Sequence, residues 1–241
     1  MTAPKAALFD LDDTLAESFQ PPSTSMVEKL GVLLTKMPVA IVSAAGYGRI
    51  ERDFLPILEK SPFVKNLYIL PNSSAQAYSW QDGWNEEYSL ALTHEERHRI
   101  REAIEKSAEN ADPRALILDR EVQIAYAAIG MEAPLEEKKS WDPEQSKRKA
   151  LKARLDAMLP EFEVLIGGMT TIDITRKGIS KAYGVRWLSE KLKIEPSDMV
   201  YVGDALYDGG NDAVVIPTGV QTRPVSGPDE TEKVIDELLS A

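Results

Sequence analysis

Short apolar runs that end in polar residues alternate with helical patterns along the first third of the chain. The runs at 6–9, 39–42 and 67–70 have the length and composition of buried strands. Between them, apolar residues recur at helical spacing over 26–34 and 50–58. Strands that alternate with helices form parallel sheets that are buried on both faces. The first third therefore predicts an α/β fold with a parallel sheet and helices on both faces.

The middle of the chain departs from this alternation. Residues 80–88 are polar and aromatic, which fits either a hairpin or a linker. Thr93 and Glu96 form a capping box for a helix that runs to about Asn110. The other apolar runs of this region predict strands at 116–118, 122–129, 164–166 and 170–174.

A second helix of this region is predicted to start after Asp142. That residue supplies an N-cap, with Pro143 at the first helical position and Gln145 at the third. Arg148 is expected on the solvent-exposed face of this helix, paired with Glu144 one turn earlier.

The last third returns to the first pattern, with a helix predicted over 181–192 and a buried strand over 199–202. The middle region therefore reads as an inserted module. We expect one core formed by 1–83 and 177–241, with an α+β domain at 84–176 inserted into it.

Acidic side chains outnumber basic ones in this chain. Its 241 residues include 39 Asp and Glu against 28 Lys and Arg, for a net charge of −11. We expect no nucleic-acid partner, because phosphate backbones bind to positive fields, and a small anionic substrate would need a local cation. The absence of cysteine excludes disulfides, thiolate zinc sites and cysteine nucleophiles. No apolar run reaches the roughly 18 residues of a membrane span, so we expect a cytoplasmic monomer or homodimer without membrane contact.

Two carboxylates stand two residues apart where the first apolar run ends. In extended backbone, side chains at i and i+2 point the same way, so Asp10 and Asp12 are expected to converge. Like charges at close range share a proton or bind a cation. A calcium loop begins similarly, but Leu15 and Pro21 stand where that loop needs glycine and glutamate. A pair of helix-capping aspartates is the structural alternative.

A second acidic cluster follows the predicted strand of the last third. Residues 203–212 contain three aspartates, one asparagine and three glycines. Because parallel strands end at one edge of a sheet, Asp204 is expected to join Asp10 and Asp12 there. Such oxygen ligands suit magnesium. The same edge is expected to carry a hydroxyl and a positive charge, from Ser43 and Lys181.

In their order and context, these residues resemble the four signatures of the haloacid dehalogenase (HAD) superfamily of phosphotransferases. The matches are Asp-x-Asp-x-Thr at 10–14, the strand-end Ser43, the lysine Lys181, and Gly-Asp-x-x-x-Asp from Gly203. The resemblance covers nearly the whole chain. It implies a Rossmann-like core with an inserted cap domain that chooses the substrate.

The insertion resembles the α+β cap of subclass IIB, which includes Cof-like sugar phosphatases and eukaryotic-type phosphomannomutases. Residues 167–181 resemble the cap-to-core crossing of the phosphomannomutases, and 209–212 match their Gly-Gly-Asn-Asp. Their cap carries two arginines that hold the distal phosphate of a sugar bisphosphate. Arg120 falls on the first of these, whereas Met131 stands where the second would be.

The resemblance implies a role for each signature residue. Asp10 would attack phosphorus and form an aspartyl-phosphate, and Asp12 would act as general acid and then general base. Asp10, Asp204 and the backbone carbonyl of Asp12 would ligate Mg²⁺. Lys181 and Ser43 would offset the negative charge of the phosphate.

Other residues receive supporting roles from the same resemblance. The motif spacing favours Asp208 as support for the metal, whereas the subclass favours Asn211 and Asp212. Arg176 fits a substrate-facing position or a solvent-exposed hinge. The expected substrate-binding residues are Thr14, Arg120, Asp173 and Arg176.

The leading functional hypothesis is a magnesium-dependent phosphatase of small phosphorylated metabolites such as sugar phosphates. The alternative is a phosphohexomutase of the phosphomannomutase kind, and the third hypothesis is a catalytically silent phosphate-binding relative. A signalling receiver domain also gathers aspartates and a lysine at a sheet edge. It is much shorter, however, and has no use for a general acid two residues after its nucleophile.

Overall fold

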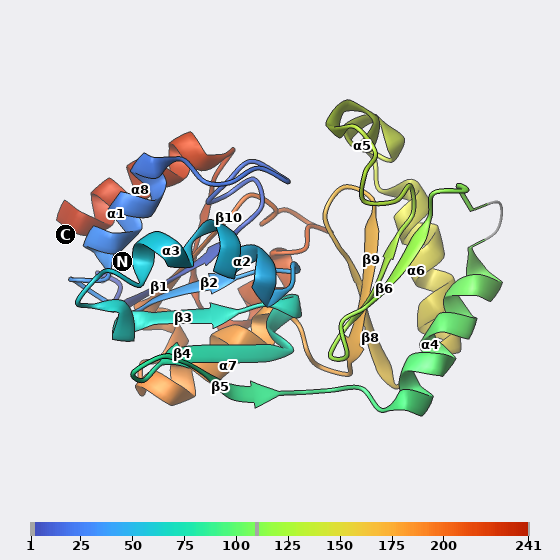
Figure 1. The fold of residues 1–241 in the computed structure, drawn as a ribbon, viewed down its shortest axis with the longest axis horizontal. Helices are drawn as coiled ribbons and strands as arrows, with labels where there is room; N and C mark the ends of the chain where they lie inside the picture. The colour runs from blue at the N-terminus through green and yellow to red at the C-terminus, as the bar shows by residue number, and fades with distance from the viewer. Residues whose placement is uncertain (1–2, 109–110, 241) are drawn as a thin grey trace. The chain divides into compact units, whose positions relative to one another are not determined.

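The structure is a computed structural model that describes residues 3–108 and 111–240 (Figure 1). The chain divides into two compact units, of which unit 1 comprises Met1–Ser89 with Lys181–Ala241 and unit 2 comprises Leu90–Ser180. These limits lie a few residues from the boundaries expected at 83/84 and 176/177. Each unit has its own sheet and its own hydrophobic core.

A seven-stranded sheet forms the centre of unit 1 in the described part of the chain. Its order is β11-β10-β1-β2-β3-β4-β5, parallel from β11 to β3 and antiparallel from β3 to β5. This parallel-dominated sheet confirms the predicted fold class. The strands are Ala6–Asp10 (β1), Val39–Val42 (β2), Leu67–Leu70 (β3), Gln76–Trp80 (β4), Trp84–Ser89 (β5), Met199–Gly203 (β10) and Gln221–Pro224 (β11).

Helices cover both faces of this sheet, because successive residues of a strand point to opposite faces. Ala7 and Phe9 of β1 pack with α1, α2, α3 and α8, whereas Ala6 and Leu8 pack with α7 on the other side. Burial on both faces explains why β1 is a continuous apolar run up to Asp10. The helices are Thr24–Leu33 (α1), Tyr47–Asp53 (α2), Leu55–Leu58 (α3), Lys181–Leu192 (α7) and Pro228–Ser240 (α8).

Unit 1 differs from the sequence prediction at two places. The segment 50–58, predicted as one helix, is divided between α2 and α3 at Phe54, because Pro56 has no amide hydrogen to continue the ladder. Residues 80–88 lie in the β4–β5 hairpin, which confirms the first of the two alternatives for this segment. The edge strand β11 is polar and partly exposed, so no apolar pattern predicts it. Short 3₁₀ turns complete the unit: Val64–Asn66 (η1), Asn72–Ser74 (η2), Pro196–Asp198 (η3) and Ala213–Thr218 (η4).

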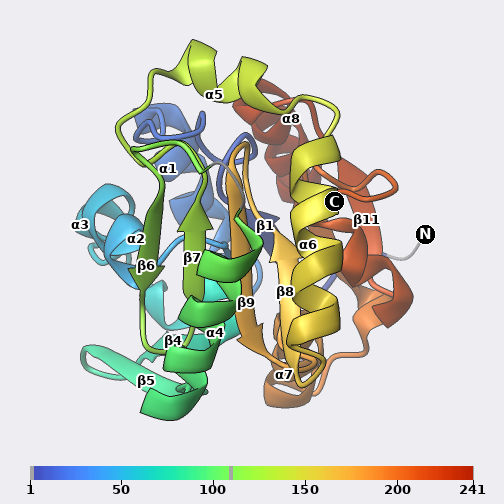
Figure 2. The ribbon, with the colours of Figure 1, turned by 90° about the vertical axis from the view of Figure 1, so that its right-hand side faces the viewer.

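Unit 2 is an antiparallel sheet with two long helices on one face. Its strand order is β6-β7-β9-β8, and Figure 2 shows α4 and α6 lying over the same side. Residues of both helices pack on Ile124, Tyr126, Ile172 and Ile174 of the central strands. The elements are His94–Ser107 (α4), Leu116–Asp119 (β6), Ile124–Ala127 (β7), Leu135–Trp141 (α5), Ser146–Met158 (α6), Phe162–Ile166 (β8) and Thr171–Arg176 (β9).

The helix starts of unit 2 match the prediction in one case and not in the other. Thr93 and Glu96 form the predicted capping box of α4, whose expected end at Asn110 lies outside the described residues. By contrast, α6 begins at Ser146 and not directly after Asp142, because Gln145 adopts a left-handed backbone conformation with φ +57°. Within the described residues, none of the helices is long and apolar enough to cross a bilayer.

Arg148 is buried, contrary to the prediction that it lies on the solvent face of its helix. Its side chain is 5% exposed and pairs with Asp142 (Nε to Oδ2, 3.1 Å), not with Glu144. The guanidinium also donates to the carbonyls of Asp142 (3.0 Å), Gly167 (3.1 Å) and Gly168. Asp142 in turn accepts the backbone N–H of Arg148 (3.0 Å). This network joins the start of α6 to the turn between β8 and β9.

The substitution Arg148→Met is expected to lower the free energy of unfolding by about 3 kcal/mol, because it leaves Asp142 buried without its cation. Arg154→Met, at an exposed position of the same helix, is expected to change it by less than about 0.5 kcal/mol. Urea denaturation followed by circular dichroism measures both. Equal, small changes in the two variants would contradict a stabilising role for the buried pair.

Candidate active site

The candidate site lies where three neighbouring parallel strands end. Asp10 is the last residue of β1, Ser43 follows β2, and Asp204 follows β10. Since β1 pairs in parallel with both β2 and β10, their carboxyl ends lie at one edge of the sheet. Polar residues are tolerated there because the buried faces of the sheet stop at that edge.

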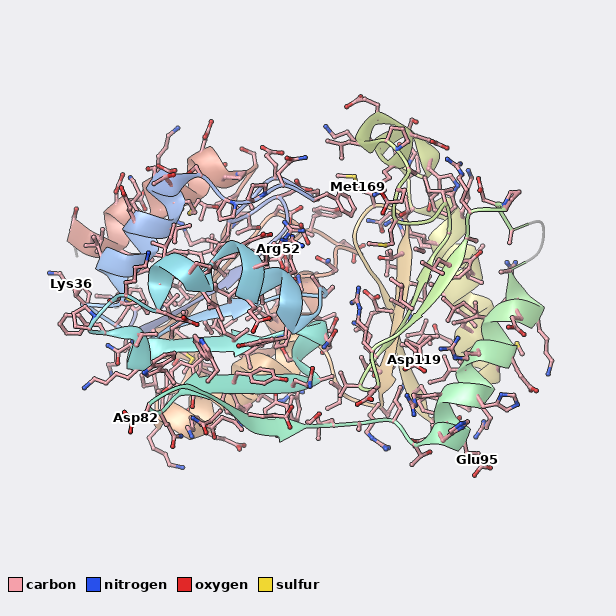
Figure 3. All side chains as sticks on the ribbon, in the orientation of Figure 1. Lys36, Arg52, Asp82, Glu95, Asp119 and Met169 are labelled. Atoms are coloured by element: carbon pink, nitrogen blue, oxygen red, sulfur yellow. The ribbon has the colours of Figure 1, made fainter. Side chains whose placement is uncertain are left out.

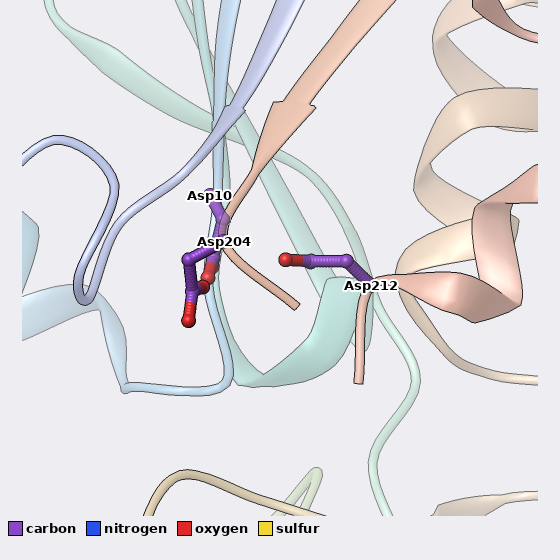
Figure 4. Close-up of side chains that lie close together, drawn as sticks. All are labelled: Asp10, Asp204 and Asp212. Carbon is purple, nitrogen blue, oxygen red and sulfur yellow. The ribbon is translucent and has the colours of Figure 1, made fainter. Parts of the chain in front are cut away.

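Three carboxylates gather at this edge, as Figure 4 shows for Asp10, Asp204 and Asp212. One oxygen from each lies within 4.8 Å of the others. Asp212 approaches from the loop before η4, opposite the two strand-end aspartates. The group thus differs from the expected trio: it contains Asp212, and Asp12 is not part of it.

Lys181 is the cation of this group. The residue is the first of α7, its side chain is 3% exposed, and its Nζ lies 2.8 Å from Asp10 Oδ1 and 2.7 Å from Asp212 Oδ1. Burial by itself lowers the pKa of Lys181, but the charges of Asp10 and Asp212 outweigh it and raise that pKa. Lys181 is therefore held as an ammonium between two carboxylates.

One ammonium does not neutralise three carboxylates. Burial raises the pKa of Asp10 well above its ordinary value against the attraction of Lys181, and Asp212 and Asp204 raise it further by repulsion. Burial, with the charge of Asp212, also raises the pKa of Asp204 to about 6. Converging carboxylate oxygens with uncompensated negative charge are a fitting donor set for a hard divalent cation. The residues present thus fit a metal ion.

Asp212 is fixed in place by several contacts. Its Oδ1 accepts the Tyr201 hydroxyl (2.6 Å) as well as Lys181, and its Oδ2 accepts the backbone N–H of Ala205 (3.2 Å). A Cβ on Gly203 would collide with this carboxylate, which explains the glycine at the end of β10. Sequence reasoning missed Tyr201, because an aromatic residue in a buried strand gives no sign of what its hydroxyl contacts.

Two residues with predicted roles hold the site loops. Thr14 is fully buried, and its Oγ1 accepts the backbone N–H of Asp204 (3.1 Å), so the contact observed for Thr14 joins the loops after β1 and β10. Ser43 is 1% exposed, and its Oγ accepts the backbone N–H of Ala45 (3.0 Å). Thr14 thus holds the backbone at Asp204, and its expected contact with substrate stays a prediction.

Asp12 has separate surroundings from the three carboxylates. Its Oδ1 lies 3.5 Å from Arg49 Nη2. Burial raises the pKa of Asp12, and Arg49 and the backbone N–H of Phe19 oppose that shift. The loop that follows is shaped by Asp13, which has a left-handed φ of +56° and accepts the Ser18 backbone N–H (2.9 Å) and hydroxyl (2.7 Å).

A strained turn supports the Ser43 loop, and sequence reasoning missed it. Asn72, Ser73 and Ser74 have φ values of +52°, +56° and +66°, a conformation that costs roughly 1–2 kcal/mol for each non-glycine residue. Their amides bind the neighbouring loop: Ser73 N–H donates to Ser43 O and Asn72 N–H to Ala45 O, both at 2.8 Å. The available signal was the Pro-Asn-Ser-Ser run directly after a strand, which is typical of a turn.

The three candidates for support of the metal lie in different environments. Asp208 is exposed to solvent. Asn211 has a buried Oδ1 that accepts no hydrogen bond from the described residues, and Asp212 is fully buried within the carboxylate group. The two residues that the subclass resemblance favours as support for the metal, Asn211 and Asp212, thus have buried side-chain oxygens, whereas Asp208 is exposed.

The predicted substrate-binding residue Asp173 lies on the face of the unit 2 sheet that the helices leave uncovered. Its neighbours Ile172 and Ile174 pack against those helices, so Asp173 points to the opposite side, where it pairs in register with Ala125. Asp173 is 3% exposed, and a Cβ on Gly167 would collide with its carboxylate. The turn after β8 therefore needs glycine at this position.

Two arginines of unit 2 have local partners. Arg120 follows β6, and its Nη1 donates to Gln123 Oε1 at 2.7 Å. Arg176 donates to the Ala91 carbonyl (2.9 and 2.6 Å) and to both oxygens of Glu96 (2.9 Å each). Arg176 thus joins the end of β9 to the start of α4, and the two positions expected for it stay predictions.

Comparison with known proteins gives concordant results. A model of the family described as haloacid dehalogenase-like hydrolase matches residues 137–212. Phosphomannomutase 2 from Dictyostelium discoideum is 22% identical over 251 residues, which cover 96% of this chain and 95% of the relative.

Solved structures share the fold. An N-terminally truncated, IMP-bound IMP-nucleotidase from Plasmodium falciparum superposes with a TM-score of 0.74 at 19% identity, covering 99% of this chain and 69% of that one. A haloacid dehalogenase-like hydrolase from Bacteroides thetaiotaomicron gives a TM-score of 0.67 at 14% identity, covering 98% and 99%. The chain is thus similar over residues 137–212 to haloacid dehalogenase-like hydrolases, and it shares its fold with solved members of that family.

Proposed function

We propose that the protein is a magnesium-dependent phosphatase of small phosphorylated metabolites that works through a phosphorylated Asp10. The observation that carries this proposal is the group of Asp10, Asp204 and Asp212 around the buried Lys181 at the carboxyl end of β1. A carboxylate nucleophile needs nearby positive charge before it can approach a phosphate dianion. This edge of the sheet provides both the nucleophile and that charge.

The proposed reaction has two displacements at phosphorus. Asp10 attacks, a bond forms between its carboxylate oxygen and phosphorus, and the bond to the leaving oxygen breaks while Asp12 donates its proton to that oxygen. A water molecule then attacks the phosphoaspartate, Asp12 takes a proton from it, and the bond between Asp10 and phosphorus breaks. The enzyme returns to its starting state with inorganic phosphate as product.

The metal has a defined place in this proposal. Asp10, Asp204 and Asp212 would hold Mg²⁺, with the Asp12 backbone carbonyl expected as a further ligand, and the bound ion would supply positive charge next to the transferring phosphoryl group. Lys181 adds a fixed charge on the protein side and opposes the rise in the pKa of Asp10 that burial causes. Thr14 and Tyr201 keep the Asp204 backbone and the Asp212 carboxylate in position.

A sugar phosphate is the substrate class we favour. The net charge of −11 disfavours large polyanions, and the relative of similar length is a phosphomannomutase. Asp173, on the uncovered face of the unit 2 sheet, is a suitable acceptor for sugar hydroxyls. Arg120 is the candidate contact for a second anionic group.

A phosphohexomutase is the second candidate, because the phosphomannomutase likeness extends over 96% of this chain. A mutase must hold and reorient a bisphosphate, which requires two anion-binding residues in the cap. Met131 stands in place of one of them, and its side chain is 37% exposed. This difference favours the phosphatase.

Asp10→Asn is expected to lower turnover of p-nitrophenyl phosphate in the presence of Mg²⁺ by more than about 1,000-fold, because an amide is a poor nucleophile. Asp13→Asn is the matched control, since asparagine tolerates the left-handed conformation and its Oδ1 can still accept the Ser18 backbone N–H. Its turnover should stay within about threefold of the parent. Equal turnover in Asp10→Asn and the parent would refute the nucleophile assignment.

Asp204→Asn is expected to weaken Mg²⁺ binding at least about tenfold, because it removes one charged ligand of the three. Isothermal titration calorimetry of the protein with Mg²⁺ measures this without reference to activity. The exposed Asp208 provides the control, and Asp208→Asn should leave the affinity within about twofold. A larger loss in the Asp208 variant than in the Asp204 variant would overturn the proposed ligand set.

Incubation with mannose 1-phosphate and a hexose 1,6-bisphosphate distinguishes the two candidate functions. A phosphatase transfers the phosphoryl group of Asp10 to water, so free phosphate is expected to accumulate. Appearance of mannose 6-phosphate in its place would establish the mutase. Phosphate assay and ³¹P NMR of the same sample follow both products.

A further inference from the structure

Arg49 connects the Asp12 loop to helix α2. Its Nη2 lies 3.5 Å from Asp12 Oδ1 and donates a hydrogen bond to the Gln20 carbonyl at 2.7 Å. Its Nε lies 2.5 Å from Asp53 Oδ2, one helical turn later. The side chain is 14% exposed, so these contacts are largely shielded from solvent. None of the four sequence signatures includes this residue.

The distance between Arg49 and Asp12 distinguishes this pair from an ordinary salt bridge. At 3.5 Å the guanidinium attracts the carboxylate, but the Asp12 Oδ1 atom accepts no hydrogen bond from the described residues. Arg49 Nη2 donates instead to Gln20, and Arg49 Nε lies at ion-pair distance from Asp53 without a hydrogen-bond partner among the described residues. The charge of Arg49 therefore constrains the orientation of Asp12 without a hydrogen bond to its Oδ1.

Asp53 restrains Arg49 from the other side. The Asp53 side chain is 6% exposed and accepts two further bonds from Arg52, at 2.7 and 2.9 Å. With Asp53 held in this way, Arg49 has little freedom to move closer to Asp12. Arg49 also restrains the loop that contains Gln20, because it donates a hydrogen bond to the Gln20 carbonyl.

We propose that Arg49 is a positioning residue for proton transfer by Asp12. It holds the Asp12 carboxyl group where a proton can pass to the leaving oxygen and return from water, without binding the transferring oxygen itself. This inference rests on the proposed function, in which Asp12 is the general acid and base.

The role has a measurable signature, because leaving groups differ in their need for a proton. p-Nitrophenolate leaves readily without protonation, whereas the more basic p-methoxyphenolate benefits from a general acid, which contributes about 10²- to 10⁴-fold where it is needed. Loss of positioning should therefore lower kcat/KM mainly for the substrate with the more basic leaving group. A defect in folding or phosphate binding would affect both substrates equally.

The test compares kcat/KM for p-nitrophenyl phosphate and p-methoxyphenyl phosphate with Mg²⁺. For Arg49→Met, we expect the loss on the methoxy substrate to exceed the loss on the nitro substrate by about tenfold. Arg49→Lys, which keeps the charge but cannot make all the contacts, should give an intermediate ratio. Lys60→Met is the control, because Lys60 is exposed and follows α3, whereas Arg52 (Figure 3) binds the Asp53 that restrains Arg49. The ratio for Lys60→Met should equal that of the parent.

Asp12→Asn separates failure of the inference from failure of the proposed function. A selective loss in Asp12→Asn with equal losses on both substrates in Arg49→Met overturns the role of Arg49 and leaves the proposed function intact. Absence of a selective loss in Asp12→Asn overturns the general-acid assignment and the inference with it. A selective loss in both variants, with parent-like thermal unfolding of Arg49→Lys, supports the proposal.

Discussion

Repulsion among three carboxylates is the constraint around which unit 1 is organised. Asp10, Asp204 and Asp212 lie within 4.8 Å of one another, and burial of Asp10 and Lys181 weakens the screening that water would provide. A single lysine offsets part of this charge. The rest must be met by a cation or by a proton, and burial together with this repulsion raises the pKa values of Asp10 and Asp204. The negative charge that remains destabilises this edge of the sheet and makes it suitable for a metal cation.

Such a site needs a rigid support, and the sheet provides it. Residues of β1 alternate between two hydrophobic clusters, so the backbone that carries Asp10 is fixed from both sides. The loops beyond the strand ends contain left-handed residues at Asp13 and at 72–74, whose conformational cost only a well-packed framework can offset. Backbone strain thus occurs in the loops beside the carboxylates, where exact backbone placement matters most.

The strands that carry the site and most of its signature residues could be predicted from the sequence, because they depend on local patterns. Apolar runs mark the buried strands, and Asp10, Ser43 and Asp204 stand directly after them. The contacts that the sequence could not give are those between distant segments. Examples are the Tyr201 hydroxyl on Asp212 and the burial of Arg148, whose basic neighbours suggested a solvated helix face. The predicted helix limits were also wrong where a single residue changes the backbone conformation, as at Phe54 and Gln145.

Lys181 and Arg49 show how a cation at different distances contacts a carboxylate in an acidic protein. Lys181 lies 2.8 Å from Asp10 and 2.7 Å from Asp212, so it holds both carboxylates in place by direct charged contacts. Arg49 lies 3.5 Å from Asp12, with a hydrogen bond to the Gln20 carbonyl and an ion pair with Asp53 on its other side. A direct hydrogen bond there would stabilise the anion and obstruct its protonation. A group that must gain and lose a proton in each cycle is better served by a cation that orients it without occupying its oxygen.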